Sequence, residues 1–191
     1  MTIHDSSFPT EFLSECLDFC RAVGAEKIYG TGHRILESYP FHTSVIQMSA
    51  SVDVLPETDA ALFPVTEKTI SRWREIYNER MKNVDNASFM SECDGEQILK
   101  RGNGYFVHRD GELLGIGIGS GDRIDCVASA KRGSGVEVVS ALKHALMCER
   151  VVLEVASTNE RAIKLYESMG FIKTAELSRW YKIFELSRKN T

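Results

Sequence analysis

The feature that most constrains the fold is the stretch 151–171, which predicts a buried strand leading directly into a capped helix. It opens with the apolar, largely β-branched run VVLEVA and continues with Ser157, Thr158 and Asn159, all favourable N-cap residues. Apolar residues then recur at helical spacing before Gly170 ends the helix; they are Ala162, Ile163, Leu165, Tyr166 and Met169. Such a unit places Asn159 at the carboxyl end of a strand, the edge at which α/β sheets bind ligands.

A similar unit lies just upstream, where the loop AKRGSG joins a predicted strand at 123–128 to a predicted helix at 135–147. Its two glycines allow backbone N–H groups to turn toward a ligand, and the helix N-terminus adds further unpaired donors. Arg132 adds a full positive charge, so the loop suits a phosphate or pyrophosphate. It matches neither the P-loop nor the GxGxxG pattern, and an ordinary strand-to-helix turn explains it equally well on its own.

The remaining patterns predict a mixed α/β (α+β) sheet flanked by helices. Helices are expected at 10–23, 66–84 and 86–100, the last one broken near Asp94-Gly95, and strands are expected at 27–29, 43–54, 104–108, 113–118, 171–175 and 180–186. The segment Arg109-Asp-Gly-Glu112 is a good hairpin turn between two of these strands. Residues 56–64 are predicted to be a loop, and residues 1–9 a loose terminus.

Composition excludes several classes of function. The 191 residues carry a formal charge of -4, which argues against nucleic acid as a partner because phosphate binding needs a clustered basic surface. No apolar run is long enough to span a membrane, and the N-terminus lacks the pattern of a signal peptide. The five cysteines form no CxxC motif, which favours a reduced, cytoplasmic protein. Cys16 and Cys20 lie one helical turn apart without a further ligand nearby, so we expect core packing and no metal site.

We expect two parts along the chain, an N-terminal extension at 1–55 and a catalytic domain at 56–191. The segment LESYPF at 36–41 is similar to YESMGF at 166–171, so the extension could be a vestigial half-module of the main domain. Chance recurrence of a short helix–strand pattern is at least as good an explanation. A third reading is that residues 1–55 form an interaction arm for a partner chain.

Taken together, the two units carry a specific resemblance. The order of strand, Arg-Gly-x-Gly loop, helix, strand, Asn-x-x-Ala-x-x-x-Tyr and Gly-Phe resembles the GNAT superfamily of N-acetyltransferases over residues 44–186, and most specifically over 123–171. The resemblance implies a sheet that is splayed between the strands near 123–128 and 151–156. It also implies acetyl-CoA as co-substrate.

The same resemblance implies roles for individual residues. The pyrophosphate of CoA would lie on five consecutive residues, which are Arg132, Gly133, Ser134, Gly135 and Val136. The pantetheine arm would pair with the backbone of Val127 and Ala128, and Asn159 would contact it from the other side of the splay. Tyr166 matches the general acid that is frequent in the family.

One departure from the family pattern is Glu137, where the family usually has Gly or Ala. A carboxylate in the first turn suits the helix dipole but opposes a bound pyrophosphate if it points inward, so we expect Glu137 to point to solvent. A second departure is Ser129, where a proline is common. Cys126 lies on the strand that would face the cofactor, and we expect it to pack and not to act as a nucleophile.

The expected function is transfer of an acyl group, most simply acetyl, from acyl-CoA to a primary amine in a ternary complex. Such an amine must lose a proton before it attacks the thioester, and the candidate bases are Asp122, Asp125 and Glu154. The acceptor would be a small-molecule or peptide amine, and a homodimer is left open. The alternative is a non-catalytic CoA-binding sensor.

Overall fold

The structure is a computed structural model that describes residues 10–85 and 87–185. The expectations for residues 1–9 and for Leu186 therefore lie outside the described residues. The described chain divides into two compact units, a smaller one formed by residues 10–45 with 176–185, and a larger one formed by residues 46–175. Two long strands, β2 (Phe41–Ser51) and β8 (Ile172–Glu185), run from one unit into the other.

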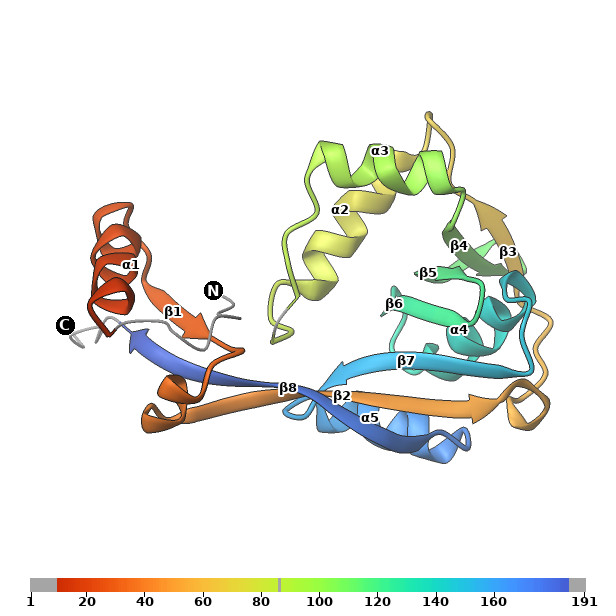
Figure 1. Cartoon of the computed structure of the whole chain (residues 1–191). Helices are drawn as coiled ribbons and strands as arrows, with labels where there is room; N and C mark the ends of the chain where they lie inside the picture. Colours follow the sequence, from red (N-terminus) through yellow and green to blue (C-terminus); the bar gives the residue numbers. More distant parts are fainter. Residues whose placement is uncertain (1–9, 86, 186–191) are drawn as a thin grey trace. The chain divides into compact units, whose positions relative to one another are not determined.

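The smaller unit consists of one helix, a short strand and the ends of the two long strands (Figure 1). Helix α1 (Thr10–Ala22) is followed by β1 (Lys27–Gly30) and a 3-10 helix (Arg34–Ser38). Strand β1 pairs antiparallel with residues 181–185 of β8. A small apolar core holds the unit together; its buried members are Leu13, Leu17, Ile28, Leu36 and Tyr181.

The larger unit is a mixed sheet with the strand order β8–β2–β7–β6–β5–β4–β3. Its remaining strands are β3 (Ala61–Pro64), β4 (Gly104–Arg109), β5 (Glu112–Ser120), β6 (Arg123–Ser129) and β7 (Arg150–Ala156). Its helices are α2 (Ile70–Met81), α3 (Glu92–Arg101), α4 (Gly135–Leu142) and α5 (Glu160–Ser168). Short 3-10 helices at Val52–Val54 and Lys143–Ala145 follow β2 and α4.

The sheet is splayed between β6 and β7. The two strands are parallel, and their register contains only the pairs Arg123↔Val152 and Ile124↔Leu153. Beyond these pairs β6 continues to Ser129 and β7 to Ala156, so the strands separate toward their carboxyl ends. The predicted mixed, splayed sheet is therefore confirmed.

A β-bulge lies where the splay begins. Ile118 of β5 pairs with Cys126, but the next residue, Gly119, pairs with Ile124, so Asp125 has no partner of its own on β5. Because side chains alternate along a strand, the extra residue reverses which face the following side chains occupy. Ile124 belongs to the core beneath α4 and α5, whereas Cys126 belongs to the core beneath α2 and α3.

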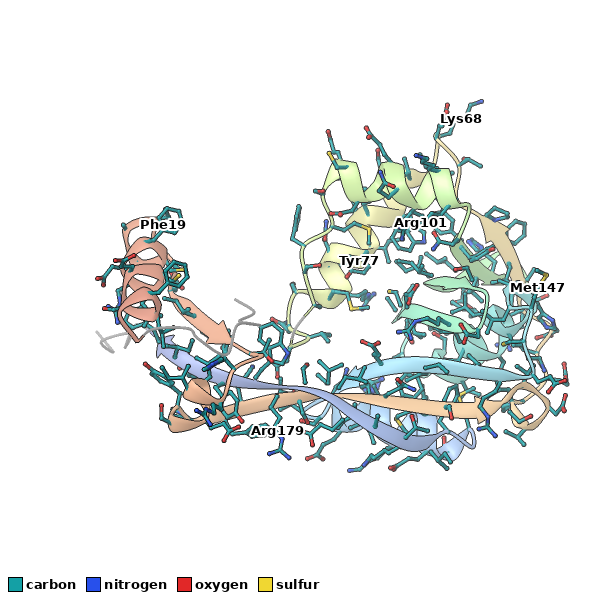
Figure 2. All side chains as sticks on the ribbon, in the orientation of Figure 1. Phe19, Lys68, Tyr77, Arg101, Met147 and Arg179 are labelled. Carbon is teal, nitrogen blue, oxygen red and sulfur yellow. The ribbon has the colours of Figure 1, made fainter. Side chains whose placement is uncertain are left out.

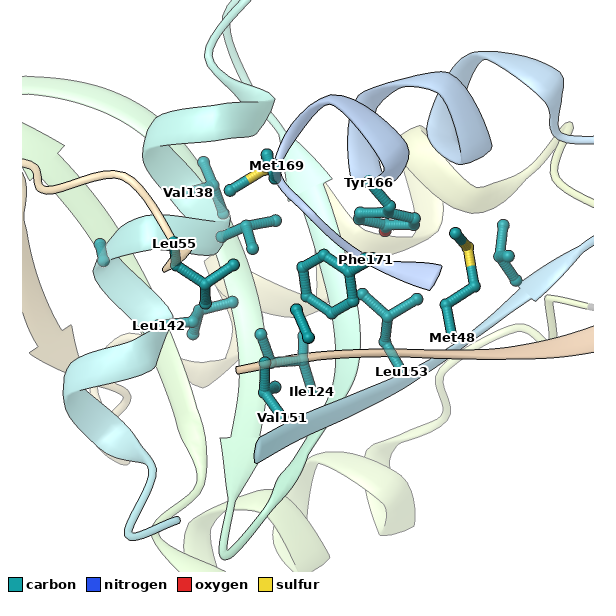
Figure 3. Packing of buried hydrophobic residues seen from close by; sticks show 14 of the residues in the cluster. Met48, Leu55, Ile124, Val138, Leu142, Val151, Leu153, Tyr166, Met169 and Phe171 are labelled. Carbon is teal, nitrogen blue, oxygen red and sulfur yellow. The ribbon is translucent and has the colours of Figure 1, made fainter. Parts of the chain in front are cut away.

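The main core joins α4, α5 and the sheet (Figure 3). Tyr166 and Phe171 lie beside each other there, with ring centroids 5.6 Å apart, next to Leu153 and Met48. Helix α4 approaches β5 so closely that a Cβ on Gly115 would lie 2.6 Å from Val138 Cγ2. The sequence signal for this close packing is the run of alternating glycines in GIGIG.

Several element predictions were wrong in detail. The predicted break near Asp94-Gly95 is absent from α3, because Asp94 completes a capping box with Ser91 and Gly95 allows the Arg74 side chain to approach. The predicted loop at 56–64 contains β3, and the two strands predicted at 171–175 and 180–186 are one strand, β8. The predicted hairpin is confirmed, with positive φ angles at Asp110 and Gly111.

None of the described helices combines the length and apolar character needed to cross a membrane. In the described part of the chain, no three His, Cys, Asp or Glu side chains gather as they would around a metal ion. Cys16 and Cys20 are both partly buried in the smaller unit.

Candidate functional site

The loop after β6 presents backbone N–H groups that bond no backbone acceptor among the described residues. The N–H groups of Ala130 and Lys131 donate to the carbonyl of Leu114. Within the described chain no backbone acceptor is recorded for the N–H groups of Arg132, Gly133, Gly135 and Val136. Gly133 has a φ of 92°, a conformation that favours glycine, and Gly135 is the first residue of α4. Four donors at a helix N-terminus can together bind an anion.

Ser134 holds this loop in place and does not offer a free group. Its side chain is buried, and its hydroxyl lies 2.6 Å from the carbonyl oxygen of Leu114 and 2.8 Å from that of Lys131. Its N–H donates to Lys131 O. Of the five loop residues predicted to bind the cofactor, Ser134 is thus the one that is fully used inside the protein.

Glu137 does not point freely to solvent as expected. Its side chain is only 28% exposed and forms an ion pair with Arg109, at the end of β4. The attraction of Glu137 raises the pKa of the Arg109 guanidinium. The carboxylate is therefore neutralised by a partner on the hairpin, and its opposition to a nearby anion is reduced. Lys131 is similarly paired with Glu112, at 2.7 Å.

On the other side of the splay, Asn159 caps α5. Its Oδ1 accepts a hydrogen bond of 3.2 Å from the N–H of Ala162, which confirms the predicted cap. The loop and α5 are close together, since a Cβ on Gly135 would lie 3.2 Å from the Leu165 side chain. The two predicted binding segments therefore meet across the carboxyl ends of β6 and β7.

Tyr166 lies beneath the splay and is largely buried. Its side chain is 7% exposed, and no hydrogen bond to its hydroxyl is recorded among the described residues. Burial raises the pKa of the Tyr166 phenol, and the nearby Cys126 thiol adds to this shift. Tyr166 comes from α5 and Cys126 from β6, so the phenol approaches β6 at the bulge. The hydroxyl therefore stays protonated and is available as a hydrogen-bond donor.

A second phenol approaches the same thiol from α2. Burial raises the pKa of Tyr77, and the nearby Cys126 again contributes. The Tyr77 ring stacks on Trp73 with centroids 5.8 Å apart, and Figure 2 shows its side chain at the lower part of α2. Cys126 itself is buried, with a pKa raised to about 12, so it is no ready nucleophile. Sequence reasoning missed Tyr77, because its helical spacing alone indicates core packing.

The three candidate bases have different surroundings. Arg123 donates to Glu154 at 2.6 Å and also lies 3.5 Å from Asp125, so one guanidinium holds two carboxylates beside the bulge. Its hydrogen bond to Glu154 raises the pKa of Arg123. Asp122 precedes the paired residues, and its carbonyl accepts from the N–H of Val152. It therefore lies at the closed end of the splay, away from the gap.

Comparison with known proteins finds a family match over this region. Residues 70–171 match the family described as Acetyltransferase (GNAT) family. A curated relative, N-alpha-acetyltransferase 30 of Xenopus laevis, is 31% identical over 93 residues, which cover 47% of this chain. The match spans 32% of that relative's length, and 24% of the length of its human counterpart.

Solved structures share the fold at low sequence identity. A conserved protein of unknown function from Staphylococcus epidermidis superposes over 95% of this chain and 81% of its own, with a TM-score of 0.61 and 11% identity. A GCN5-related N-acetyltransferase from Anabaena variabilis superposes over 89% of this chain and 48% of its own, with a TM-score of 0.63 and 11% identity. At such identities the likeness concerns the fold alone.

Proposed function

Because the chain belongs to the acetyltransferase (GNAT) family, we propose that it is an N-acetyltransferase that transfers the acetyl group of acetyl-CoA to a primary amine. The observation that carries the proposal is the gap between β6 and β7, with N–H donors at one wall that bond no backbone acceptor in the described chain, and the largely buried Tyr166 phenol beneath it. An extended thioester arm fits such a gap, because alternate backbone groups of an unpaired strand edge remain free to bond it.

The free groups suit the different parts of the co-substrate. The N–H groups of Arg132, Gly133, Gly135 and Val136 would hold the pyrophosphate, and the exposed Arg132 side chain would add charge. Val127 and Ala128 pair with Gly117 and Ile116 of β5 on one side, and the backbone groups that point to the gap on the other side would bond the pantetheine arm. The Asn159 side chain would contact the arm from the β7 side through its amide nitrogen, while its oxygen caps α5.

The chemistry requires a neutral amine and a protonated leaving group. Among the three carboxylates we propose Glu154 as the general base that takes the proton of the acceptor ammonium, because it is exposed and held beside the gap. As the amine nitrogen bonds to the carbonyl carbon and the carbon–sulfur bond breaks, the Tyr166 hydroxyl donates its proton to the leaving sulfur. The new amide nitrogen loses one proton to water, and uptake of a proton from water restores the phenol.

The acceptor is proposed from the relatives. The curated relatives are named as N-alpha-acetyltransferases, so peptides with a free N-terminal amine are the first acceptors to test, followed by small polyamines. A cytoplasmic location and a homodimer stay predictions, as does a boundary between an N-terminal extension and the catalytic domain at residue 55.

The test is to incubate the protein with acetyl-CoA and a panel of peptide and small-molecule amines, and to measure acetylated product by mass spectrometry. Release of free thiol gives a second readout, corrected with a blank without amine because Cys93 is exposed. Product that depends on both substrates supports the proposal. Tight CoA binding without turnover of any amine would support the alternative, a non-catalytic CoA sensor.

A further inference from the structure

Residues 80–85 cross from one splayed strand to the other. At the end of α2, Arg80 Nη2 donates a hydrogen bond of 2.8 Å to the carbonyl oxygen of Ala130, the first residue after β6. Five residues later, Asp85 Oδ2 accepts a hydrogen bond of 2.6 Å from the hydroxyl of Thr158, two residues after β7. We call this segment, residues 80–85, the strap.

The strap closes a ring around the mouth of the gap. Both attachment points follow the carboxyl ends of the separated strands, and the strands themselves are joined at Arg123↔Val152 and Ile124↔Leu153. Five peptide steps span at most about 17 Å, so the ring is tight. An arm lying in the gap would pass inside this ring, with the N–H groups of the loop outside it.

The strap is also connected to residues on the α2 side of the sheet. Just before it, the side chain of Asn78 accepts a hydrogen bond of 2.8 Å from the N–H of Met90 and donates one of 3.1 Å to the Met90 carbonyl. Tyr77 is hydrogen-bonded to Ser88 in the same connection between α2 and α3. A movement of the strap would therefore shift Tyr77, which lies near Cys126 beside the bulge.

The two attachments differ in character. Arg80 extends from the last turn of α2 and bonds a backbone carbonyl, so this end of the strap is attached to a helix at one side and to the main chain at the other. The bond between Asp85 and Thr158 joins two side chains outside helices and strands. It can open by side-chain rotation on the fast timescales of surface residues.

We propose that the strap is a gate for the acyl-CoA arm, with Asp85 and Thr158 as the latch and Arg80 as the hinge. Asp85, Thr158 and Arg80 are then positioning residues that open to admit the arm and close over it. The inference rests on the proposed function, because it requires CoA to bind in the gap.

The experiment measures the association and dissociation rates of CoA by stopped-flow fluorescence, with Thr158→Val as the main variant. Valine has nearly the volume of threonine and removes the hydroxyl donor. The latch is closed both in the free and in the bound protein. Its loss therefore lowers the free-energy barrier both for association and for dissociation of CoA. We expect both rates to rise roughly tenfold, as for the loss of one charge-assisted hydrogen bond, and the dissociation constant to change far less. Asp85→Asn, which keeps an acceptor oxygen, should give a smaller rise in both rates.

The matched control is Thr174→Val. Thr174 is another exposed threonine whose hydroxyl donates to a neighbour, Gln47 O at 3.2 Å, but it lies on β8 away from the gap. Both valine variants should melt within a few degrees of the wild type.

If Thr158→Val has the same two rates as Thr174→Val, the gate is excluded while the proposed function stands. A rise in the dissociation rate alone would also overturn the gate, because it would identify an ordinary binding contact. A wild-type protein that binds no CoA would overturn the proposed function and the gate together.

Discussion

Arg123 of β6, which is itself paired with Val152, donates to Glu154 of β7, the residue that follows the last paired residue of that strand, Leu153. The ion pair thus takes over the connection between the strands where the backbone hydrogen bonds end. Its side chains are 41% exposed, so it contributes little to stability. Because the pair lies where the two strands begin to separate, its Glu154 carboxylate is placed to act on an acceptor amine that enters the gap.

The Glu154→Gln variant tests whether Glu154 acts on the acceptor amine. Loss of the negative charge should lower kcat/KM for the amine by about 100-fold, the lower range for a group that assists proton transfer. The affinity for CoA should be unchanged, because Glu154 lies on β7 away from the loop N–H groups. Steady-state kinetics and CoA titration measure the two quantities. The control is Glu176→Gln, which breaks the exposed pair with Arg179. A variant at Glu154 that keeps the wild-type kcat/KM would remove this residue from the mechanism.

Tyr166→Phe tests the proton donor. We expect kcat to fall by about 100-fold or more, while CoA binding survives because the ring still packs against Phe171. Since burial raises the pKa of Tyr166 above its ordinary value of 10.0, the wild-type enzyme should lose no activity through ionisation of this group up to pH 10. A pH–rate profile of both proteins measures this. An unchanged kcat in the phenylalanine variant would contradict the proposed role.

Cys126 should make the fold sensitive to alkali. Burial raises its pKa from 9.0 to about 12, so the unfolded thiol loses its proton at a lower pH than the native one. Between these values the unfolded state binds fewer protons, and the free energy of unfolding falls as pH rises. Its contribution is complete below pH 9 and declines toward pH 12. Urea unfolding at pH 7.5 and pH 10 should show a smaller loss for Cys126→Ala than for the wild type. Equal losses would show that other groups, such as Tyr77 and Tyr166, dominate.

Gly115 should not tolerate a side chain. A Cβ there would lie 2.6 Å from both Val138 Cγ2 and the carbonyl oxygen of Ala128, and overpacking of this kind costs about 1–3 kcal/mol. Gly115→Ala should therefore lower the free energy of unfolding by that amount, as measured by urea denaturation. Gly119→Ala on the same strand is the control, because its nearest neighbour would be at an ordinary 3.4 Å. Equal stability of the two variants would contradict the close approach of α4.

Deleting residues 1–55 should abolish the fold of the larger unit. The deletion removes β2, which lies between β7 and β8 in the sheet, and with it the buried Met48. Circular dichroism and solubility of the truncated chain measure the outcome. A soluble, active truncated protein would show instead that these residues are a dispensable extension.

The part of the fold that sequence could predict is the part whose signals are local. The cap at Asn159, the hairpin at Asp110-Gly111 and the strand-to-helix loop at Gly133 each depend on a few neighbouring residues, and all are found in the structure. The predicted splay came from the resemblance of these local units to a family, and could not have been read from either strand alone.

The errors came from contacts that are distant in sequence. Gly95 suggested a helix break, but its lack of a side chain serves the approach of Arg74 from another helix. Strand β3 has only four residues, and it forms a strand because it pairs with β4, which its own sequence does not reveal. Tyr77 and Arg80 look like ordinary helix residues until the fold places them beside Cys126 and Ala130. No periodic pattern contains that information.

The position of β2 has a consequence for how the chain is made. Its neighbours in the sheet are β7 and β8, both near the other end of the sequence. During synthesis at roughly 5–20 residues per second, β2 is made on the order of ten seconds before its partners β7 and β8. Such long sequence separations slow folding and leave an unpaired strand open to association with other chains. We therefore expect the nascent protein to depend on chaperones more than its modest size suggests.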